Sequence, residues 1–201
     1  MVMQESGEQP ATRGEARRAA ILQAAIDEFS TRGIARASMA KIAASAGVSR
    51  PALYQYFSDK HEIFAFAFVD LFERLVENAL AALDEPGPIG ERLDEFLQRY
   101  EGDLYERMAA SPHVDELIAA KDAQVAASIH VVIARLTAGL EQYLASIAPG
   151  RGKAALAQRT GWVEMLRLAP TGFRFDQPGV DVFRSRLTTL ANSTAAAIDA
   201  A

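Results

Sequence analysis

The stretch from Ser38 to Lys60 constrains the fold of this chain more than any other. Apolar residues recur at helical spacing in two short segments of it, and Gly47 lies between the two. Glycine enters the left-handed backbone region at little steric cost, so Gly47 is expected to end the first helix. Ser49 is a good N-cap for the second helix, and Pro51 suits its first turn, where a missing amide hydrogen costs nothing. These residues predict two short helices joined by a tight turn, which is a helix-turn-helix.

The exposed side of the second predicted helix indicates what this unit binds. Two short helices around a glycine also occur in all-α proteins that never contact DNA, so the spacing alone leaves both interpretations open. This helix, however, carries Arg50 and Gln55 together with two tyrosines, and Lys60 follows it. Arginine pairs with guanine edges, glutamine with adenine edges, and tyrosine hydroxyls with phosphates. The residue types therefore favour a helix that reads the major groove of DNA.

The same residues resemble the DNA-binding signature of tetracycline-repressor (TetR) type regulators. That signature is Gly-Val-Ser, a short variable segment, then Leu-Tyr-x-[His/Tyr]-Phe-x-x-Lys, and every element is present between Gly47 and Lys60. The upstream residues Phe29 and Gly33 also fit. The resemblance covers about residues 17–64, and no motif matches beyond Leu83. It implies an N-terminal DNA-binding domain and a helical body that binds a small ligand and dimerises.

The resemblance also implies roles for individual residues of the motif. Arg50, Ala52 and Gln55 stand where the family reads bases, although Ala52 could offer only apolar contact to a thymine methyl. The two tyrosines and Lys60 are expected to hold phosphates. Ser38, the expected N-cap of the first helix, should hold another through its hydroxyl and the helix amides. The full set expected to contact DNA is Ser38, Lys41, Ser49, Arg50, Pro51, Ala52, Tyr54, Gln55, Tyr56 and Lys60.

The charge of the chain is unevenly distributed. Its net charge of −5 is opposite to that expected of a DNA-binding protein. Residues 11–60, however, hold eight basic and four acidic residues, whereas residues 61–201 hold thirteen basic and twenty acidic ones. A basic end on an acidic body directs that end toward DNA and keeps the rest away from it.

The predicted fold is all-α, because no segment shows the alternation typical of strands. We expect a disordered tail over residues 1–14, the helix-turn-helix domain over 15–60, and a helical regulatory and dimerisation domain over 61–201. A helix is expected to begin after Ser58, its N-cap. It is apolar around nearly its whole circumference, which predicts a buried helix that rigidly connects the two domains. The helices are expected at about 15–31, 58–83, 88–109, 114–147, 153–168 and 180–198.

No catalytic, metal or cofactor site is predicted. The three histidines show no metal-ligand spacing, and the chain has no cysteine. There is no glycine-rich phosphate loop and no nucleophile elbow. The sequence also lacks an apolar signal core and an uninterrupted apolar run of membrane-spanning length. We therefore expect a cytoplasmic protein that is neither an enzyme nor a membrane protein.

Aromatic and apolar residues of the body are candidates for an effector site and a dimer interface. Apolar side chains at such spacing are more often simply core, and both interpretations stay open. The candidates for an apolar effector cavity are Phe96, Tyr100, Tyr105, Met108 and Trp162. The candidates for a homodimer interface between the last two helices are Trp162, Phe183, Leu187, Leu190, Ala191 and Thr194.

The resemblance to TetR-type regulators implies a repressor that binds a palindromic operator in double-stranded DNA and is released by a small, largely apolar effector. The main alternative is a DNA-binding regulator without a small ligand, controlled by a protein partner. A more distant alternative is a helical enzyme that carries a vestigial helix-turn-helix.

Overall fold

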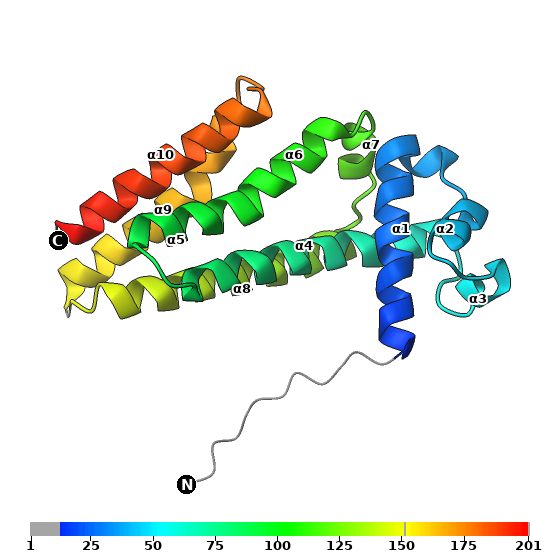
Figure 1. Ribbon diagram of the computed structural model, residues 1–201, viewed down its shortest axis with the longest axis horizontal. Helices are drawn as coiled ribbons and strands as arrows, with labels where there is room; N and C mark the ends of the chain where they lie inside the picture. The colour runs from blue at the N-terminus through cyan, green and yellow to red at the C-terminus, as the bar shows by residue number, and fades with distance from the viewer. Residues whose placement is uncertain (1–12, 151, 201) are drawn as a thin grey trace, which may run out of the picture.

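The computed structural model describes residues 13–150 and 152–200, and this part of the chain is helical without a strand. Helices α1 to α3 gather at one end of the molecule, and the remaining helices extend from them as an elongated body (Figure 1). Two long helices of the body, α4 (Lys60–Asp84) and α8 (Ala123–Ile147), run side by side. The buried side chains of both parts form one continuous cluster. The predicted all-α architecture is confirmed.

Helix α1, Arg13–Arg36, stands across the N-terminal end of α4. It includes Arg13 and Gly14, which the sequence analysis assigned to the tail; the rest of that tail lies outside the described residues. Its regular part ends at Gly33, as predicted, because the backbone there has φ 71° and ψ 163°. Only glycine adopts this combination readily. A short helical turn then continues to the end of α1.

Helix α4, Lys60–Asp84, begins one residue later than predicted. Its N-cap is Asp59 rather than Ser58, because the Asp59 carboxylate accepts hydrogen bonds from the amides of His61 at 2.8 Å and Glu62 at 2.9 Å. These bonds hold the pKa of Asp59 below its usual value. The prediction that α4 is buried all round is also wrong, since Phe66 is 46% exposed. One face of α4 packs on α1, α5 and α8.

The segment predicted as one helix over 88–109 has three parts. Helix α5, Ile89–Leu97, passes into a π-helical turn, η1, Gln98–Gly102, and then into α6, Asp103–Ala110. This turn was not predicted from the sequence. Such wide turns are rare and often occur at functional sites.

The segment predicted as one helix over 114–147 is also divided. Helix α7, Val114–Ala119, is followed by α8, Ala123–Ile147, because Asp122 caps a new helix by accepting from the amide of Val125 at 2.8 Å. Helix α8 is long and apolar enough to cross a membrane by length and composition alone. Its buried residues pack against α4 and α9, and 28% of its apolar window is buried.

The chain ends in α9, Lys153–Phe173, and α10, Val180–Asp199. Helix α9 runs beyond its predicted end near Leu168 and includes Pro170. Helix α10 packs on α5 and, less extensively, on α9. Both helices lie in the part of the body away from α1 to α3 (Figure 1).

Candidate nucleic-acid interface

The helix-turn-helix consists of α2, Met39–Ser45, and α3, Arg50–Tyr54. Gly47 ends the first helix with φ 66°, and the amide of Val48 donates to Ala43 O at 3.0 Å. Ser49 caps the second helix, since its hydroxyl accepts from the amide of Ala52 at 3.2 Å. Both features are as predicted. Ser38 occupies the N-cap position of α2, but its side chain makes no capping hydrogen bond.

Buried side chains fix which face of this unit is turned outward. Ile42 of α2 and Leu53 of α3 are fully buried, and Phe57 is nearly so. They join the core made with α1, where Phe29 meets Phe64 of α4 edge-on with ring centroids 5.7 Å apart. The first turns of α4 therefore pack directly against the core of the DNA-binding unit. The opposite faces of α2 and α3 remain open to solvent.

The residues predicted to contact DNA divide into two groups by exposure. Most of the outer face of α3 is available, and the Arg50 guanidinium lies 5.7 Å from the centroid of the Tyr54 ring. Lys60 is directed inward, because its Nζ donates to Ala35 O at 2.8 Å. Lys41, Ser49, Arg50, Pro51, Tyr54 and Gln55 are exposed, whereas Ser38, Ala52, Tyr56 and Lys60 are half-buried.

The electrostatics of this end favour a polyanion. Residues 29–58 contain four basic residues, Arg32, Arg36, Lys41 and Arg50, and no acidic residue. A segment that carries basic residues and no acidic ones attracts phosphates. Arg18 of α1 is held elsewhere, since its guanidinium lies 5.0 Å from the ring centroid of Phe66.

A second connection joins the DNA-binding unit to the body. The Ser111 hydroxyl donates to Ser30 O at 2.9 Å, and the amide of Ala35 donates to Oε1 of Glu116 at 2.8 Å. The end of α1 is thereby held by α7 as well as by Lys60 of α4. We call the contact of Glu116 with Ala35 the α7 latch. No local pattern relates positions so far apart in the chain, so this contact was not predicted from the sequence.

The latch predicts different outcomes at two glycines that both have positive φ. A Cβ at Gly33 would collide with the Glu116 carboxylate, whereas a Cβ at Gly47 would meet nothing within 4 Å. Gly33→Ala should therefore cost about 1–3 kcal/mol in free energy of unfolding and displace the latch. Gly47→Ala, the matched control, should cost less. Thermal denaturation of both variants shows which one loses more stability. An equal loss of unfolding free energy at the two sites would contradict the latch.

The body contains a cavity of about 370 Å³ between α4, η1, α8 and α9. Tyr100 lines it, and Phe96 lines a small adjoining space that shares Tyr100 and Leu136 with it. Tyr105 is directed elsewhere: its ring stacks on Phe183 at 4.2 Å between centroids, and its hydroxyl donates to Pro178 O at 2.6 Å. Met108 and Trp162 do not line the cavity. The structure thus brings together two of the five predicted effector residues.

The cavity also contains charged residues that the sequence analysis missed. The π-helical turn buries Tyr100 and Glu101 side by side, and Glu101 forms an ion pair with Arg174, the C-cap of α9. Burial raises the pKa of the Glu101 carboxyl, and the adjacent guanidinium opposes that shift. Burial also raises the pKa of the Tyr100 hydroxyl. Among the described residues, no group of three or more histidine, cysteine, aspartate or glutamate side chains could hold a metal ion.

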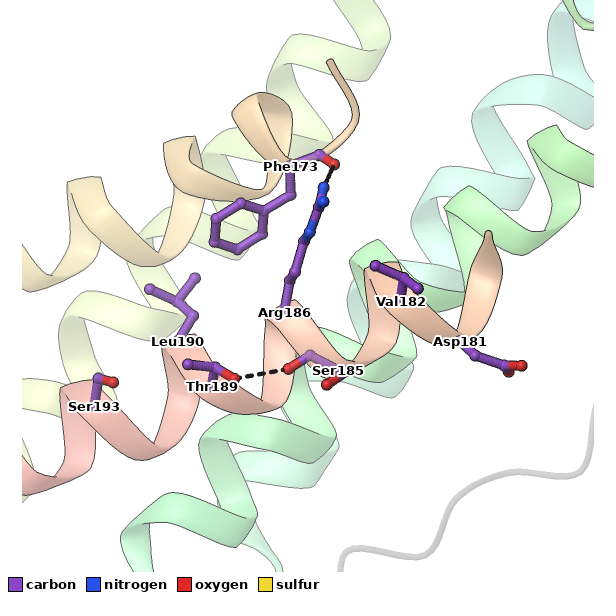
Figure 2. A pocket seen from close by; sticks show the side chains of 8 residues that line it. All are labelled: Phe173, Asp181, Val182, Ser185, Arg186, Thr189, Leu190 and Ser193. Atoms are coloured by element: carbon purple, nitrogen blue, oxygen red, sulfur yellow. Dashed lines mark hydrogen bonds between the residues drawn. The ribbon is translucent and has the colours of Figure 1, made fainter. Parts of the chain in front are cut away.

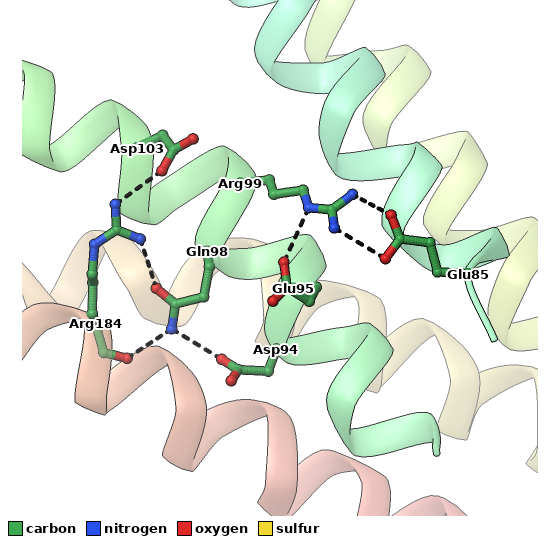
Figure 3. Close-up of polar contacts among 7 residues, drawn as sticks. All are labelled: Glu85, Asp94, Glu95, Gln98, Arg99, Asp103 and Arg184. Atoms are coloured by element: carbon green, nitrogen blue, oxygen red, sulfur yellow. Dashed lines mark hydrogen bonds and ion pairs between the residues drawn. The ribbon is translucent and has the colours of Figure 1, made fainter. Parts of the chain in front are cut away.

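Polar contacts on both sides fix the turn that carries these residues (Figure 3). The side-chain amide of Gln98 donates to Asp94 at 2.9 Å and to the carbonyl oxygen of Arg184 at 3.0 Å, which ties η1 to α10. Arg99 donates both Nη groups to Glu85, just beyond the end of α4. The turn is therefore anchored between α4 and α10.

The residues predicted for a dimer interface are not at the surface. All six are buried within the single chain: Trp162 belongs to the buried side of α9, and the other five belong to the stripe with which α10 packs on α5 and α9. This assignment is corrected. The outward faces of the two helices carry a different set, of mostly small or apolar residues. They are Ala154, Ala157, Gly161, Met165 and Gly172 on α9, and Val182, Ser185, Thr189, Ser193 and Ala196 on α10.

An open groove of about 570 Å³ follows the outward face of α10. Val182, Thr189 and Leu190 line it together with Phe173 at the end of α9 (Figure 2). Arg186 closes one side, since its guanidinium donates to Phe173 O at 2.7 Å.

Comparison with known proteins identifies the class to which this arrangement belongs. Residues 21–66 match the family model for bacterial regulatory proteins of the tetR family. The uncharacterized HTH-type transcriptional regulator YdgC of Bacillus subtilis is 36% identical over 76 residues, 38% of this chain and 39% of that protein. The HTH-type transcriptional repressor SCO4008 of Streptomyces coelicolor is 34% identical over 83 residues, 41% and 42% of the two chains. The alignments thus span about two fifths of these curated relatives.

Solved structures extend the likeness to the body. A structure from Mesorhizobium loti described as a TetR-family regulator covers 94% of this chain and 98% of its own, with TM-score 0.66 and 19% identity. A TetR-like transcriptional regulator from Rhodococcus sp. RHA1 covers 90% and 96%, with TM-score 0.53 and 26% identity. The matched motif and the fold define a helix-turn-helix domain of the tetR-family type over residues 21–66, joined to a helical body that shares the fold of these solved structures.

Proposed function

We propose that this chain is a cytoplasmic repressor of transcription that binds a palindromic operator as a homodimer and leaves it when a small molecule occupies the body. The observation that carries the proposal is the exposed face of α3 and its C-cap, which offers Arg50, Tyr54 and Gln55 in a segment, residues 29–58, that holds no acidic residue. The likeness to transcriptional regulators over residues 21–66 supports it.

Selection from random DNA tests the proposal. We expect the full chain to enrich an inverted repeat whose half-sites lie about one helical turn, 34–36 Å, apart. Enrichment of no sequence, or of a single asymmetric site bound by one copy, would contradict it.

Within this proposal, Arg50 and Gln55 read base edges, and Lys41, Ser49 and Tyr54 hold phosphates. Ser38, Pro51, Ala52 and Tyr56 flank these contacts. Lys60 has a different role from the one inferred from the motif. The hydrogen bond from Lys60 to Ala35 O ties α4 to α1. Lys60 therefore fixes the orientation of the helix-turn-helix in addition to contributing a positive charge.

The exposed lysine of α2 gives a test of phosphate contact. Lys41→Ala should weaken binding to every duplex alike, because phosphates carry no base identity. The loss of one contact should lower the salt slope of log K by about 0.9. Titrations at several salt concentrations measure this, with Lys153→Ala at the start of α9 as the matched control. An unchanged slope for Lys41→Ala would remove the lysine from the interface.

We propose that the dimer forms through the outward faces of α9 and α10. Small residues on these faces allow helices of two copies to approach closely, and a groove of about 570 Å³ lies beside them. A two-fold axis through this surface would match the symmetry of a palindrome.

Control by a small molecule is supported by the cavity and by the latch. Lys121, at the junction of α7 and α8, lines the cavity, and Glu116 of α7 holds α1. A ligand that contacts this junction differently in two states of the body would shift the DNA-binding unit between them. No comparable feature favours the two alternatives, control by a protein partner alone or catalysis by the body.

A further inference from the structure

The cavity between α4, η1, α8 and α9 has an unbalanced set of charges. Glu101 is the only acidic residue that lines it, and Arg174 already neutralises it. Lys121 and Arg167 line the same cavity, and neither forms an ion pair within residues 13–150 and 152–200. Two cationic side chains therefore remain without an anionic partner at this cavity.

The remaining wall is mostly apolar, with Tyr100, His130 and Thr171 as its other polar residues. Its apolar part includes aliphatic and aromatic side chains from α4, α6, α8 and α9: Phe72, Leu104, Ile129, Ile133, Leu136 and Leu168. The Lys121 ammonium lies 5.7 Å from the ring centroid of Phe68, so it stands beside apolar surface. In addition, Nε of Arg174 is buried without a hydrogen-bond partner. The cavity thus combines an apolar wall with unpartnered cationic donors.

We propose that this cavity binds an apolar carboxylic acid, whose carboxylate lies between Lys121 and Arg167 and whose hydrocarbon part lies along α8. This names the ligand class of the proposed function and rests on it. A neutral apolar ligand would leave both cations unpaired, and a cationic ligand would face their repulsion. An arginine fork matches the planar geometry of a carboxylate.

The position of Lys121 connects this ligand to DNA binding. Lys121 lies two residues beyond the end of α7, and Glu116 of the same helix forms the latch on α1. A carboxylate that draws Lys121 toward Arg167 of α9 would move the α7–α8 junction and, with it, the latch. Ligand charge, rather than ligand size alone, would then control the DNA-binding unit.

Three ligands of equal chain length test the proposal: decanoate, 1-decanol and decylamine. Each is titrated into the full wild-type chain by calorimetry below its micellar concentration. We expect saturable binding of decanoate at one molecule per chain, with decanol weaker and decylamine weakest. Lys121→Ala and Arg167→Ala should each weaken decanoate about tenfold or more, because each removes a charge-assisted hydrogen bond. Lys121→Arg should retain binding, and Lys153→Ala is the control for a lysine outside the cavity.

Equal or tighter binding of decanol or decylamine would overturn the proposal, and so would failure of all three ligands to bind. Operator binding, measured in parallel, separates this failure from that of the proposed function. If the chain binds the operator but not decanoate, the proposed ligand class is wrong, and the proposed function as a DNA-binding regulator is retained. If decanoate binds with the expected charge dependence but leaves operator affinity unchanged, the ligand class stands and ligand-controlled release is wrong.

Discussion

The double variant Met165→Arg with Val182→Arg is expected to be a folded monomer that has lost operator binding. Both side chains lie on the outward faces of the last two helices, 38% and 50% exposed, so an arginine at either position is solvated in the monomer. In a dimer through these faces, both charges would be buried against the other copy without a partner. Loss of the second half-site should weaken operator binding by about 10²-fold or more, because two linked contacts become one.

Sedimentation and operator titration measure the two effects on the same sample, and circular dichroism confirms that helicity is kept. Val131→Arg is the matched control, because Val131 is 72% exposed on α8, outside these faces. A stable dimer with normal operator affinity in the double variant would place the interface elsewhere. Leu187→Arg is not a suitable test, since Leu187 is fully buried and a charge there is expected to unfold the body.

The second large effect is expected from α3. Arg50→Ala and Gln55→Ala should each cost about 1–3 kcal/mol on the operator, so the double variant loses most of the preference for it over other DNA. The Arg50 guanidinium lies 5.7 Å from the centroid of the Tyr54 ring, which restricts its motion before DNA arrives. A side chain ordered in advance loses less entropy on binding.

Titrations against the selected operator and a scrambled duplex at one salt concentration measure this preference. Binding to the scrambled duplex should change little. Arg107→Ala, exposed on α6, is the control for an arginine of the body. Equal weakening on both duplexes would make these two residues phosphate contacts rather than base readers.

The helix-turn-helix could be predicted in detail because its determinants are local. Gly47, Ser49 and Pro51 each act within a few residues of their own position, and the structure shows the turn and the cap that they predict. The N-cap of α4 was misassigned by one residue, because Ser58 and Asp59 both have capping side chains. Only the geometry shows that the Asp59 carboxylate takes the free amides.

The body could be predicted only as a set of helices. A stripe such as Phe183 and Leu187 shows that a surface is buried but not whether the same chain or a second copy covers it, and here α5 and α9 cover it. The cavity residues Glu101 and Arg174 lie far apart in the sequence, and the π-helical turn that brings Glu101 inward has no local signature that we recognised. The α7 latch was missed for the same reason.

Hydroxyl-radical footprinting of the selected operator tests the central claim, that two copies of α3 enter neighbouring major grooves. We expect two protected patches on one face of the duplex, related by two-fold symmetry and about 10 base pairs apart. Arg50→Ala should leave both patches in place at saturating protein. A single patch, or protection spread evenly along the duplex, would contradict a dimer that presents one recognition helix to each half-site.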